Sequence, residues 1–600
     1  MCRACFSTIA LHDDLFEGGA NRVFGNLLGN LAGAPMPTRR TLMAMSVGAA
    51  GAAATIAAPR GARAADGAEV IFRGGKVLPM PGAAPAQALA IGGGKILAVG
   101  SEDEVAGLKS TATKIVDLGG RVLMPGFVDP HNHSVMSAVV LELLTDVGYT
   151  TYPTRAKLIE ALRAMAARTP AGEWVAASNF DNLLQGGGLT RAELDTVSTD
   201  RPIFVWYTNG HDACVNSLAL KLAGISEDVG ELPGGGHFGR GPDGKLDGQV
   251  FEEAAMFKFL PLMLPKITMA VAGKALESYL RKAAATGNTT LHEPGTLKSE
   301  WVSAFAKASP GFACRTSASL MYEDMKGYEP FRALGIGPRA TVLPDSLFSL
   351  YGVKIVGDGS NQTKTGAQTV AYLGGSAKGQ PNFDAKAVKK MVADVKAFGS
   401  TVQIHCNGDH TIDFALDAIE AAYGNSTAQG INRIEHSTIM RPDQVARMKA
   451  LNVQPSFLMN HVRFYGAAYR DQIFGPERTL LTDNAGNCVR AGIPFTLHTD
   501  SPCSPVGSLA LVETAVTRKC VVDNSVIALD QAVTLDQALR AVTIDSARQI
   551  GQGDRIGSLE KGKEADLVLL ESDPYATAPD KLSAIKVSET WVAGQKRHGG

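Results

Sequence analysis

The chain has 600 residues, which is too many for one ordinary domain and favours roughly two to four domains. With 45% hydrophobic and 20% charged residues, the composition is that of a globular protein and excludes wholesale disorder and a membrane protein of many spans. Lysine and arginine (58) nearly balance aspartate and glutamate (59), so no basic excess points to nucleic acid or to an anionic membrane surface.

Residues 1–64 are predicted to be an N-terminal extension that carries an export signal. Paired arginines in Thr38-Arg39-Arg40-Thr41-Leu42 precede a mild apolar run over 42–58, and Ala62 and Ala64 then form a small-residue cleavage pattern. This arrangement resembles a twin-arginine signal, so we expect a periplasmic or exported protein. The alternative is a cytoplasmic protein in which the run is a helix of the fold. The run is shorter than a comfortable membrane span, so no stable membrane insertion is expected.

Short strand-like segments with glycine turns lie at both ends of the mature chain. Strands are expected at 68–72, 76–79, 88–91, 95–99, 114–116, 566–570 and 587–592. Because unpaired sheet edges invite aggregation, the two ends are expected to complete each other's sheets. We therefore predict one small β-sandwich domain built from residues 65–123 and 555–600.

Between these ends, over residues 124–554, apolar strands alternate with amphipathic helices, which is the pattern of a parallel α/β barrel. Eight strands are expected at 126–130, 289–292, 313–318, 353–357, 402–405, 433–436, 453–457 and 494–499. The interval of about 135–285 is predicted to be an insertion after the first strand. The expected fold class is α/β: a (β/α)8 TIM-like barrel with a long insertion, plus the composite β-sandwich.

The first barrel strand ends in Asp129-Pro130-His131-Asn132-His133. Side chains at positions i and i+2 of a strand point the same way, so both histidines can face one ion at the mouth of the barrel. Two imidazoles at this spacing suit zinc or a similar divalent metal. Taken alone, the motif is explained equally well by two surface histidines.

Three other strand ends supply residues of the same kind. His405 ends the fifth strand, His436 ends the sixth, and His498 and Asp500 follow the eighth. Barrel active sites are assembled from the C-terminal ends of several strands, so these positions are expected to converge. A purely structural role could explain His405 or His436 taken alone. It does not readily explain four histidines and an aspartate at four separate strand ends.

Lys354 lies in the middle of the apolar fourth strand, where a charged side chain is costly unless it is paired or neutralised. One solution is reaction of the neutral amine with carbon dioxide, which gives a carbamate whose two oxygens can bridge two metals. The alternative is a buried ion pair with Glu252, Glu293 or Asp358. The residues alone leave both open.

These residues, in this order, resemble the motifs of the metal-dependent amidohydrolase superfamily. The segments 208–217, 352–359, 405–409 and 556–567 narrow the resemblance to amidohydrolase family 3, the group of N-substituted formamide deformylase-like enzymes. The resemblance spans about residues 68–595. It implies a set of metal ligands comprising His131, His133, His405, His436, Asp500 and, as a carboxylated bridge, Lys354.

The resemblance also implies a reaction. About two zinc ions per chain would lower the pKa of bound water to about 7 and polarise a carbonyl group. The expected function is hydrolysis of a C–N bond in a small amide, formamide or cyclic amide through a metal-bound hydroxide, with Asp500 as general acid and base. Weaker candidates for contact with the substrate are His211, Asn216, His461 and His498.

Two other functions stay open on the sequence. A deaminase of a ring amine would use the same hydroxide, but such deaminases generally hold one metal and lack a lysine like Lys354. A non-catalytic binding protein could keep the barrel, although such proteins typically lose metal ligands. Both enzyme functions imply a small-molecule substrate and no nucleic acid, and homo-oligomerisation is compatible with either.

Overall fold

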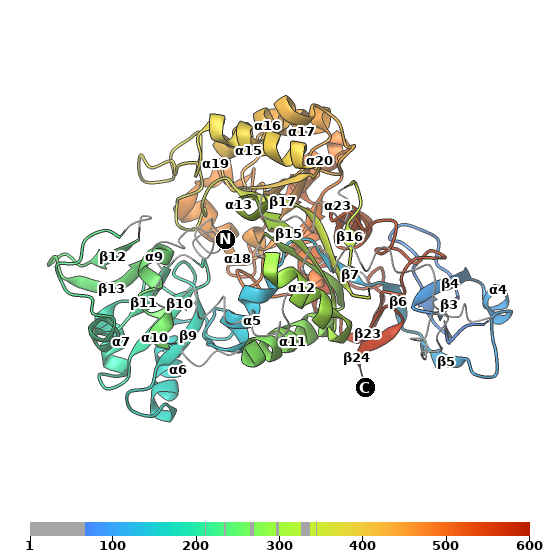
Figure 1. Cartoon of the computed structure of the whole chain (residues 1–600), viewed down its shortest axis with the longest axis horizontal. Coiled ribbons are helices and arrows are strands. Elements are labelled where there is room, and N and C mark those ends of the chain that lie inside the picture. The colour runs from blue at the N-terminus through green and yellow to red at the C-terminus, as the bar shows by residue number, and fades with distance from the viewer. Residues whose placement is uncertain are drawn as a thin grey trace, which may run out of the picture.

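The computed structural model describes residues 67–210, 212–232, 236–263, 269–295, 299–325, 337–343 and 345–599. The predicted export signal in residues 1–64 lies outside the described residues. A central barrel lies between two smaller units, the insertion on one side and the β-sandwich on the other (Figure 1). No helix in the described ranges is long and apolar enough to cross a membrane.

The barrel wall is a run of eight strands in the order β21-β20-β19-β18-β17-β15-β14-β7, all paired in parallel. They are β7 (Phe127–Asp129), β14 (Asn288–Pro294), β15 (Arg315–Met321), β17 (Phe348–Val356), β18 (Val402–Cys406), β19 (Arg433–His436), β20 (Gln454–Phe457) and β21 (Thr496–Leu497). Backbone hydrogen bonds join the two end strands where they leave the barrel, from Asp500 N to His131 O and from His133 N to Ser501 O, both 3.0 Å. The predicted (β/α)8 barrel is confirmed.

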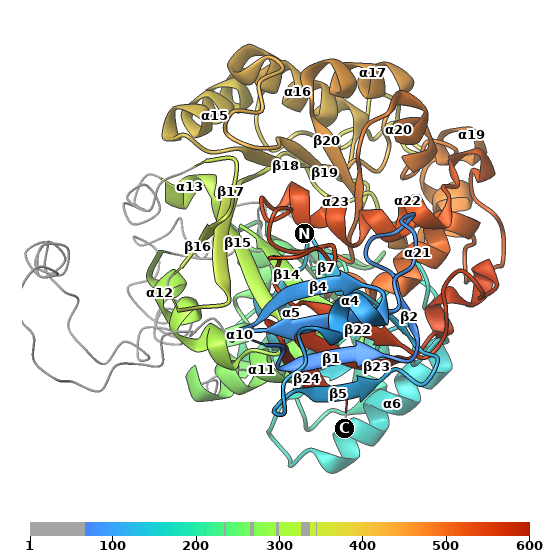
Figure 2. The same cartoon turned by 90° about the vertical axis from the view of Figure 1, so that its right-hand side faces the viewer.

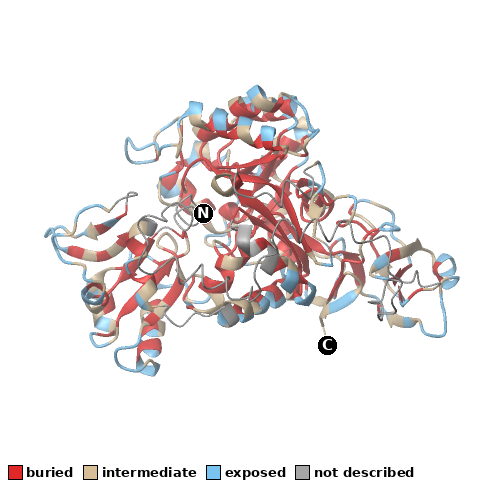
Figure 3. Cartoon of the chain, in the orientation of Figure 1, coloured by how far each residue is buried: buried red, intermediate tan, exposed pale blue. Residues whose placement is uncertain are grey.

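Helices cover the outside of the barrel, and their inner faces are buried while their outer faces are exposed (Figure 3). In α15 (Ala385–Phe398), the Asp384 side chain accepts the N–H of Ala387 at the start, and Gly399 ends the helix with a φ of 90°. The other covering helices include α11 (Met269–Ala285), α12 (Ser299–Ala308), α16 (Asp409–Tyr423), α17 (Pro442–Leu451), α18 (Asn460–Ala468), α20 (Ala485–Ala491), α21 (Ser508–Thr517), α22 (Leu535–Ala541) and α23 (Ile544–Gln549).

The insertion begins directly after β7 with α5 (Ser134–Glu142) and builds a six-stranded sheet in the order β12-β13-β11-β10-β9-β8. Its strands are β8 (Thr145–Asp146), β9 (Val175–Phe180), β10 (Ile203–Tyr207), β11 (Asp212–Val215), β12 (His237–Arg240) and β13 (Leu246–Phe251). Its helices include α6 (Arg155–Arg168), α7 (Arg191–Val197), α8 (Ser217–Leu222), α9 (Glu252–Met256) and α10 (Leu260–Met263).

Two sheets make the β-sandwich, and the second of them combines strands from both ends of the chain. The first contains β4 (Lys95–Gly100), β3 (Ala88–Gly92), β1 (Val70–Arg73) and β5 (Lys114–Asp117), and the second contains β2 (Lys76–Val77), β6 (Val122–Pro125), β22 (Leu567–Leu570), β23 (Val587–Val592) and β24 (Gln595–His598). Figure 2 shows strands from the start of the chain (blue) beside strands from its end (red), and β6 pairs with β22. Phe72 and Trp591 meet edge to face at 5.1 Å in the core of this unit.

A buried ion pair joins the sandwich to the barrel. The guanidinium of Arg315, the first residue of β15, contacts Asp566 at 2.6 Å and Glu564 at 3.0 Å.

We expect Arg315→Met to lower the free energy of unfolding by about 3–5 kcal/mol, because it leaves the buried Asp566 carboxylate without its cation. Arg73→Met is the control, since the exposed pair of Arg73 with Glu102 contributes about 0–1 kcal/mol. Equal losses in denaturant unfolding of the two variants would contradict this role.

Candidate metal centre

The turn after β7 is tied to the end of β21 by a buried carboxylate. Asp129 accepts hydrogen bonds from Asn132 Nδ2 at 3.1 Å and from the hydroxyl of Thr499. Because the two strand ends are held together, Nε2 of His131 and Nε2 of His133 each lie 3.3 Å from Asp500 Oδ1. A tetrahedral ion with bonds of about 2.0 Å keeps its ligand atoms about 3.3 Å apart, so this spacing fits one metal.

Two further histidines extend the cluster towards the next strands. The rings of His405 and His436 lie 4.5 Å apart, and those of His131 and His436 lie 4.8 Å apart. His131 Nε2, His405 Nδ1 and His436 Nε2 are buried and make no hydrogen bond within the described part of the chain. Buried nitrogens are normally paired, so unpaired nitrogens on neighbouring rings fit ligands of a cation.

The backbone bends sharply at two of these residues. His436 has a φ of 67° and Asp500 a φ of 52°, both in the left-handed region that non-glycine residues rarely adopt. Consecutive residues of a regular strand face opposite sides, but this bend at His436 lets both Glu435 and His436 reach the barrel interior. Such strained positions concentrate at functional sites.

Carboxylates contact the Nδ1 atoms of His131 and His133 and orient their rings. Nδ1 of His131 lies 2.8 Å from Glu435 Oε2, and Nδ1 of His133 lies 3.1 Å from Glu293 Oε1. Arg433 contacts Glu435 at 2.7 Å and completes the support of His131. A carboxylate on one ring nitrogen directs the other nitrogen to a metal. The sequence did not indicate Glu435, and it offered Glu293 only as a possible partner of Lys354, although each is a buried acid at the end of a barrel strand.

Burial sets the charge of most rings in the cluster. It holds the pKa of His405, His436 and His498 well below the usual range and also lowers the pKa of His131, so these imidazoles are neutral, the form that binds metals. His133 differs: burial opposes its charge, but the carboxylates of Asp500 and Glu293 raise its pKa.

Lys354 is buried, and it lies near the C-terminal end of β17. No hydrogen bond or ion pair joins its amine to another side chain in the described ranges. Of the three predicted partners, Glu293 is instead paired with His133, Asp358 accepts from the backbone of Asn407 and Gly408, and the side chain of Glu252 lies outside the description. Burial lowers the pKa of Lys354 to about 8, which raises the fraction of the neutral amine that can react with carbon dioxide.

The four weaker candidates for substrate contact have different positions. His211 lies outside the described residues. His498 stacks on His131 at 4.6 Å, and its Nε2 lies 3.2 Å from His436 Nδ1, so it lies beside the ligand cluster. His461, on α18, is buried against Thr438, whose hydroxyl lies 3.2 Å from its Nδ1.

Asn216 lies at the start of α8 in the insertion. Its side-chain oxygen accepts the N–H groups of Ile203 and Ala219, which caps α8, and its amide nitrogen donates to the carbonyls of Ser198 and Arg201. All four contacts lie inside the insertion and satisfy the amide completely. The structure therefore shows Asn216 as the cap of α8, and its contact with the substrate stays a prediction.

Comparisons with known proteins agree with the barrel and its metal-compatible cluster. The model of the amidohydrolase family matches residues 114–598. The N-substituted formamide deformylase of Arthrobacter pascens is 28% identical over 86% of this chain and 95% of its own length. The imidazolonepropionase of Solibacter usitatus is 28% identical over 36% of this chain and 45% of its own. The structure of an uncharacterized metal-dependent hydrolase from Pyrococcus horikoshii OT3 has a TM-score of 0.66 at 22% identity, covering 85% of this chain and 99% of that one.

The fold and the cluster at the strand ends define a metal-dependent hydrolase of the barrel type. The chain belongs to the amidohydrolase family, because the family model covers most of its length. It is an enzyme that acts on carbon–nitrogen bonds, and the family implies a divalent metal and a small-molecule substrate.

Proposed function

We propose that the enzyme hydrolyses the C–N bond of a small N-acyl amine, formamide or cyclic amide. The observation that carries this proposal is the group formed by His131, His133 and Asp500, whose ligand atoms lie within 4.8 Å of one another at the mouth of the barrel. The names of the relatives support it, since one acts on N-substituted formamides and another is an imidazolonepropionase.

The proposed ligands fall into two groups that share one face of the barrel. His131, His133 and Asp500 would hold one zinc ion, and His405 and His436 a second, with carboxylated Lys354 between them. The orphan nitrogens described above support this assignment. When bound, the metal supplies an acidified water and polarises the carbonyl of the substrate.

Asp500 is the proposed general acid and base. It is buried, yet the neighbouring rings of His131 and His133 oppose the effect of burial and hold the pKa of its carboxyl well below the usual range. Its carboxylate would take the proton from the attacking water and later deliver it to the leaving nitrogen. Glu435 and Glu293 keep the two histidine rings in the orientation that this geometry needs.

The test is hydrolysis by zinc-loaded protein of a panel of N-formyl amines, N-acetyl amines and lactams, with release of amine as the measurement. Ring amines are included, because release of ammonia from them would indicate the deaminase function. We expect turnover of at least one amide class, about two zinc ions per chain, and loss of activity after chelation that is restored by added zinc. Ammonia release alone, or full metal content with no amide hydrolysed, would contradict the proposal.

A further inference from the structure

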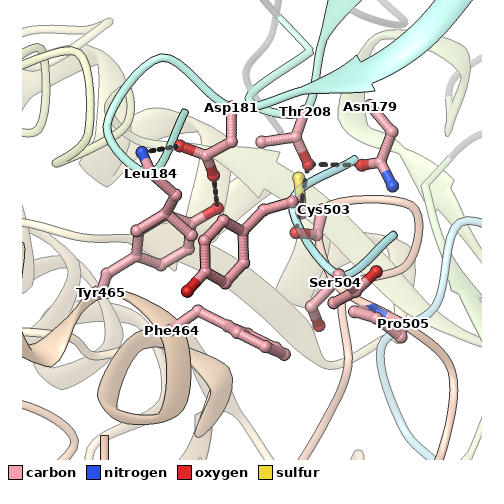
Figure 4. Close-up of a pocket in the computed structure, with 11 residues that line it drawn as sticks. Asn179, Asp181, Leu184, Thr208, Phe464, Tyr465, Cys503, Ser504 and Pro505 are labelled. Carbon is pink, nitrogen blue, oxygen red and sulfur yellow. Dashed lines mark hydrogen bonds between the residues drawn. The ribbon is translucent and has the colours of Figure 1, made fainter. Parts of the chain in front are cut away.

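A pocket opens between the insertion and the barrel, and the loop that follows Asp500 forms part of its wall (Figure 4). It contains about 330 Å³ of space not filled by atoms, part of it open to solvent. The insertion contributes Asp181 and Tyr149 to its wall, α18 contributes Phe464 and Tyr465, and the loop after β21 contributes Cys503. The pocket therefore exists only because the insertion lies over the barrel mouth.

The loop after β21 connects this pocket to the proposed catalytic carboxylate. The N–H of Cys503 donates to the carbonyl of Asp500 at 2.8 Å. Burial raises the pKa of the Cys503 thiol, and the nearby Asp500 carboxylate raises it further. Cys503 thus lines the pocket and contacts Asp500, so one short loop joins the pocket wall to the proposed catalytic carboxylate.

One acid in the wall is buried and held as an acceptor. Asp181 is 4% exposed, and it accepts the hydroxyl of Tyr465 at 2.6 Å and the N–H groups of Leu183 and Leu184 at 2.9 and 3.0 Å. All three neighbours donate, which is the arrangement of an ionised carboxylate. Burial raises the pKa of Asp181, so an incoming cation would relieve the cost of keeping this charge.

The rest of the wall, in its described residues, suits a positive charge and contains no cationic side chain. The rings of Tyr149, Phe464 and Tyr465 line the same space, and aromatic faces attract cations. None of the eleven described residues that line the pocket is a lysine, arginine or histidine. An anionic substituent would therefore meet a carboxylate with no compensating cation.

We propose that this pocket selects substrates whose amine side carries a second, positively charged nitrogen, which would lie between Asp181 and the aromatic rings. The inference rests on the proposed amide hydrolysis and deepens it, because it names the substrate class: mono-acylated diamines and similar cationic amides. The insertion then acts as the element that sets specificity.

Binding of two matched probes tests the pocket without turnover. Phenethylammonium and neutral phenethyl alcohol are titrated calorimetrically into the full-length protein, with and without zinc. We expect the cation to bind at least about tenfold more tightly, with the preference lost in Asp181→Asn and kept in Glu160→Gln, which removes an exposed charge from α6. Phe464→Leu is a second variant, since it weakens the aromatic wall and leaves the Asp181 hydrogen bonds in place.

A kinetic pair then links the pocket to catalysis. N-acetyl-pentanediamine and N-hexylacetamide differ only in the terminal group, which is an ammonium in the first and a methyl in the second. We expect kcat/KM for the first to be at least about tenfold higher. The Asp181→Asn variant should lose this difference. The inference is overturned if the wild-type protein neither binds phenethylammonium more tightly than phenethyl alcohol nor hydrolyses N-acetyl-pentanediamine faster than N-hexylacetamide. Failure of all amides to react overturns the proposed function instead, and the calorimetric preference is measurable in either case.

Discussion

Asp500→Asn is expected to lower kcat/KM for the best amide substrate by about 10³-fold, the range typical for loss of a general acid and base. The amide of asparagine fills the same space, and the hydrogen bond from the Asp500 N–H to the carbonyl of His131 is a backbone contact that the change leaves in place. The fold and most of the bound metal should therefore survive. Kinetics at saturating zinc, with metal analysis and thermal unfolding, are the measurements.

An exposed aspartate supplies the control for this experiment. Asp580→Asn removes the same charge from an exposed position of the 3-10 helix Pro579–Ala584 and should leave kcat/KM unchanged. The proposed role fails if Asp500→Asn keeps full activity. It also fails if activity returns completely at high zinc, because Asp500 would then act only through metal affinity.

The barrel was predictable because its strands are buried on both sides and appear in the sequence as short apolar β-branched runs. Two strands of the sandwich were missed for opposite reasons. Only Gly126 separates the apolar β6 (Val122–Pro125) from β7, so the two merge into one run. The edge strand β24 has the sequence Gln-Lys-Arg-His and no apolar alternation.

The histidine ligands and Asp500 were predictable because each lies at or just after the end of a strand, and the topology alone brings strand ends together. The carboxylates that orient these ligands could not be predicted from the sequence. Glu435 precedes His436 directly, so regular strand geometry would point it away, and only the left-handed φ of His436 allows both to face inward. The pocket was also beyond reach, since Asp181 and Tyr465 are 284 residues apart and meet only through the packing of the insertion.

Lys354→Met separates the two roles that its buried position allows. As a carboxylated ligand, Lys354 would be needed to hold the second ion, so the variant should bind about one zinc in place of about two and lose about a hundredfold or more in kcat/KM. Lys390→Met, on the exposed face of α15, is the control and should change neither quantity.

Stability of the metal-free protein gives the second half of this test. A buried ion pair would make Lys354→Met cost about 3–5 kcal/mol, because one carboxylate would lose its partner. The amine makes no ion pair within the described ranges, and Glu293 and Asp358 already have other partners. Replacing it by an apolar chain of similar length should therefore leave the free energy of unfolding of the apo protein unchanged or raise it. A large loss of apo stability combined with full metal content would assign Lys354 to a structural ion pair, whereas stable apo protein that binds one ion fewer assigns it to the metal centre.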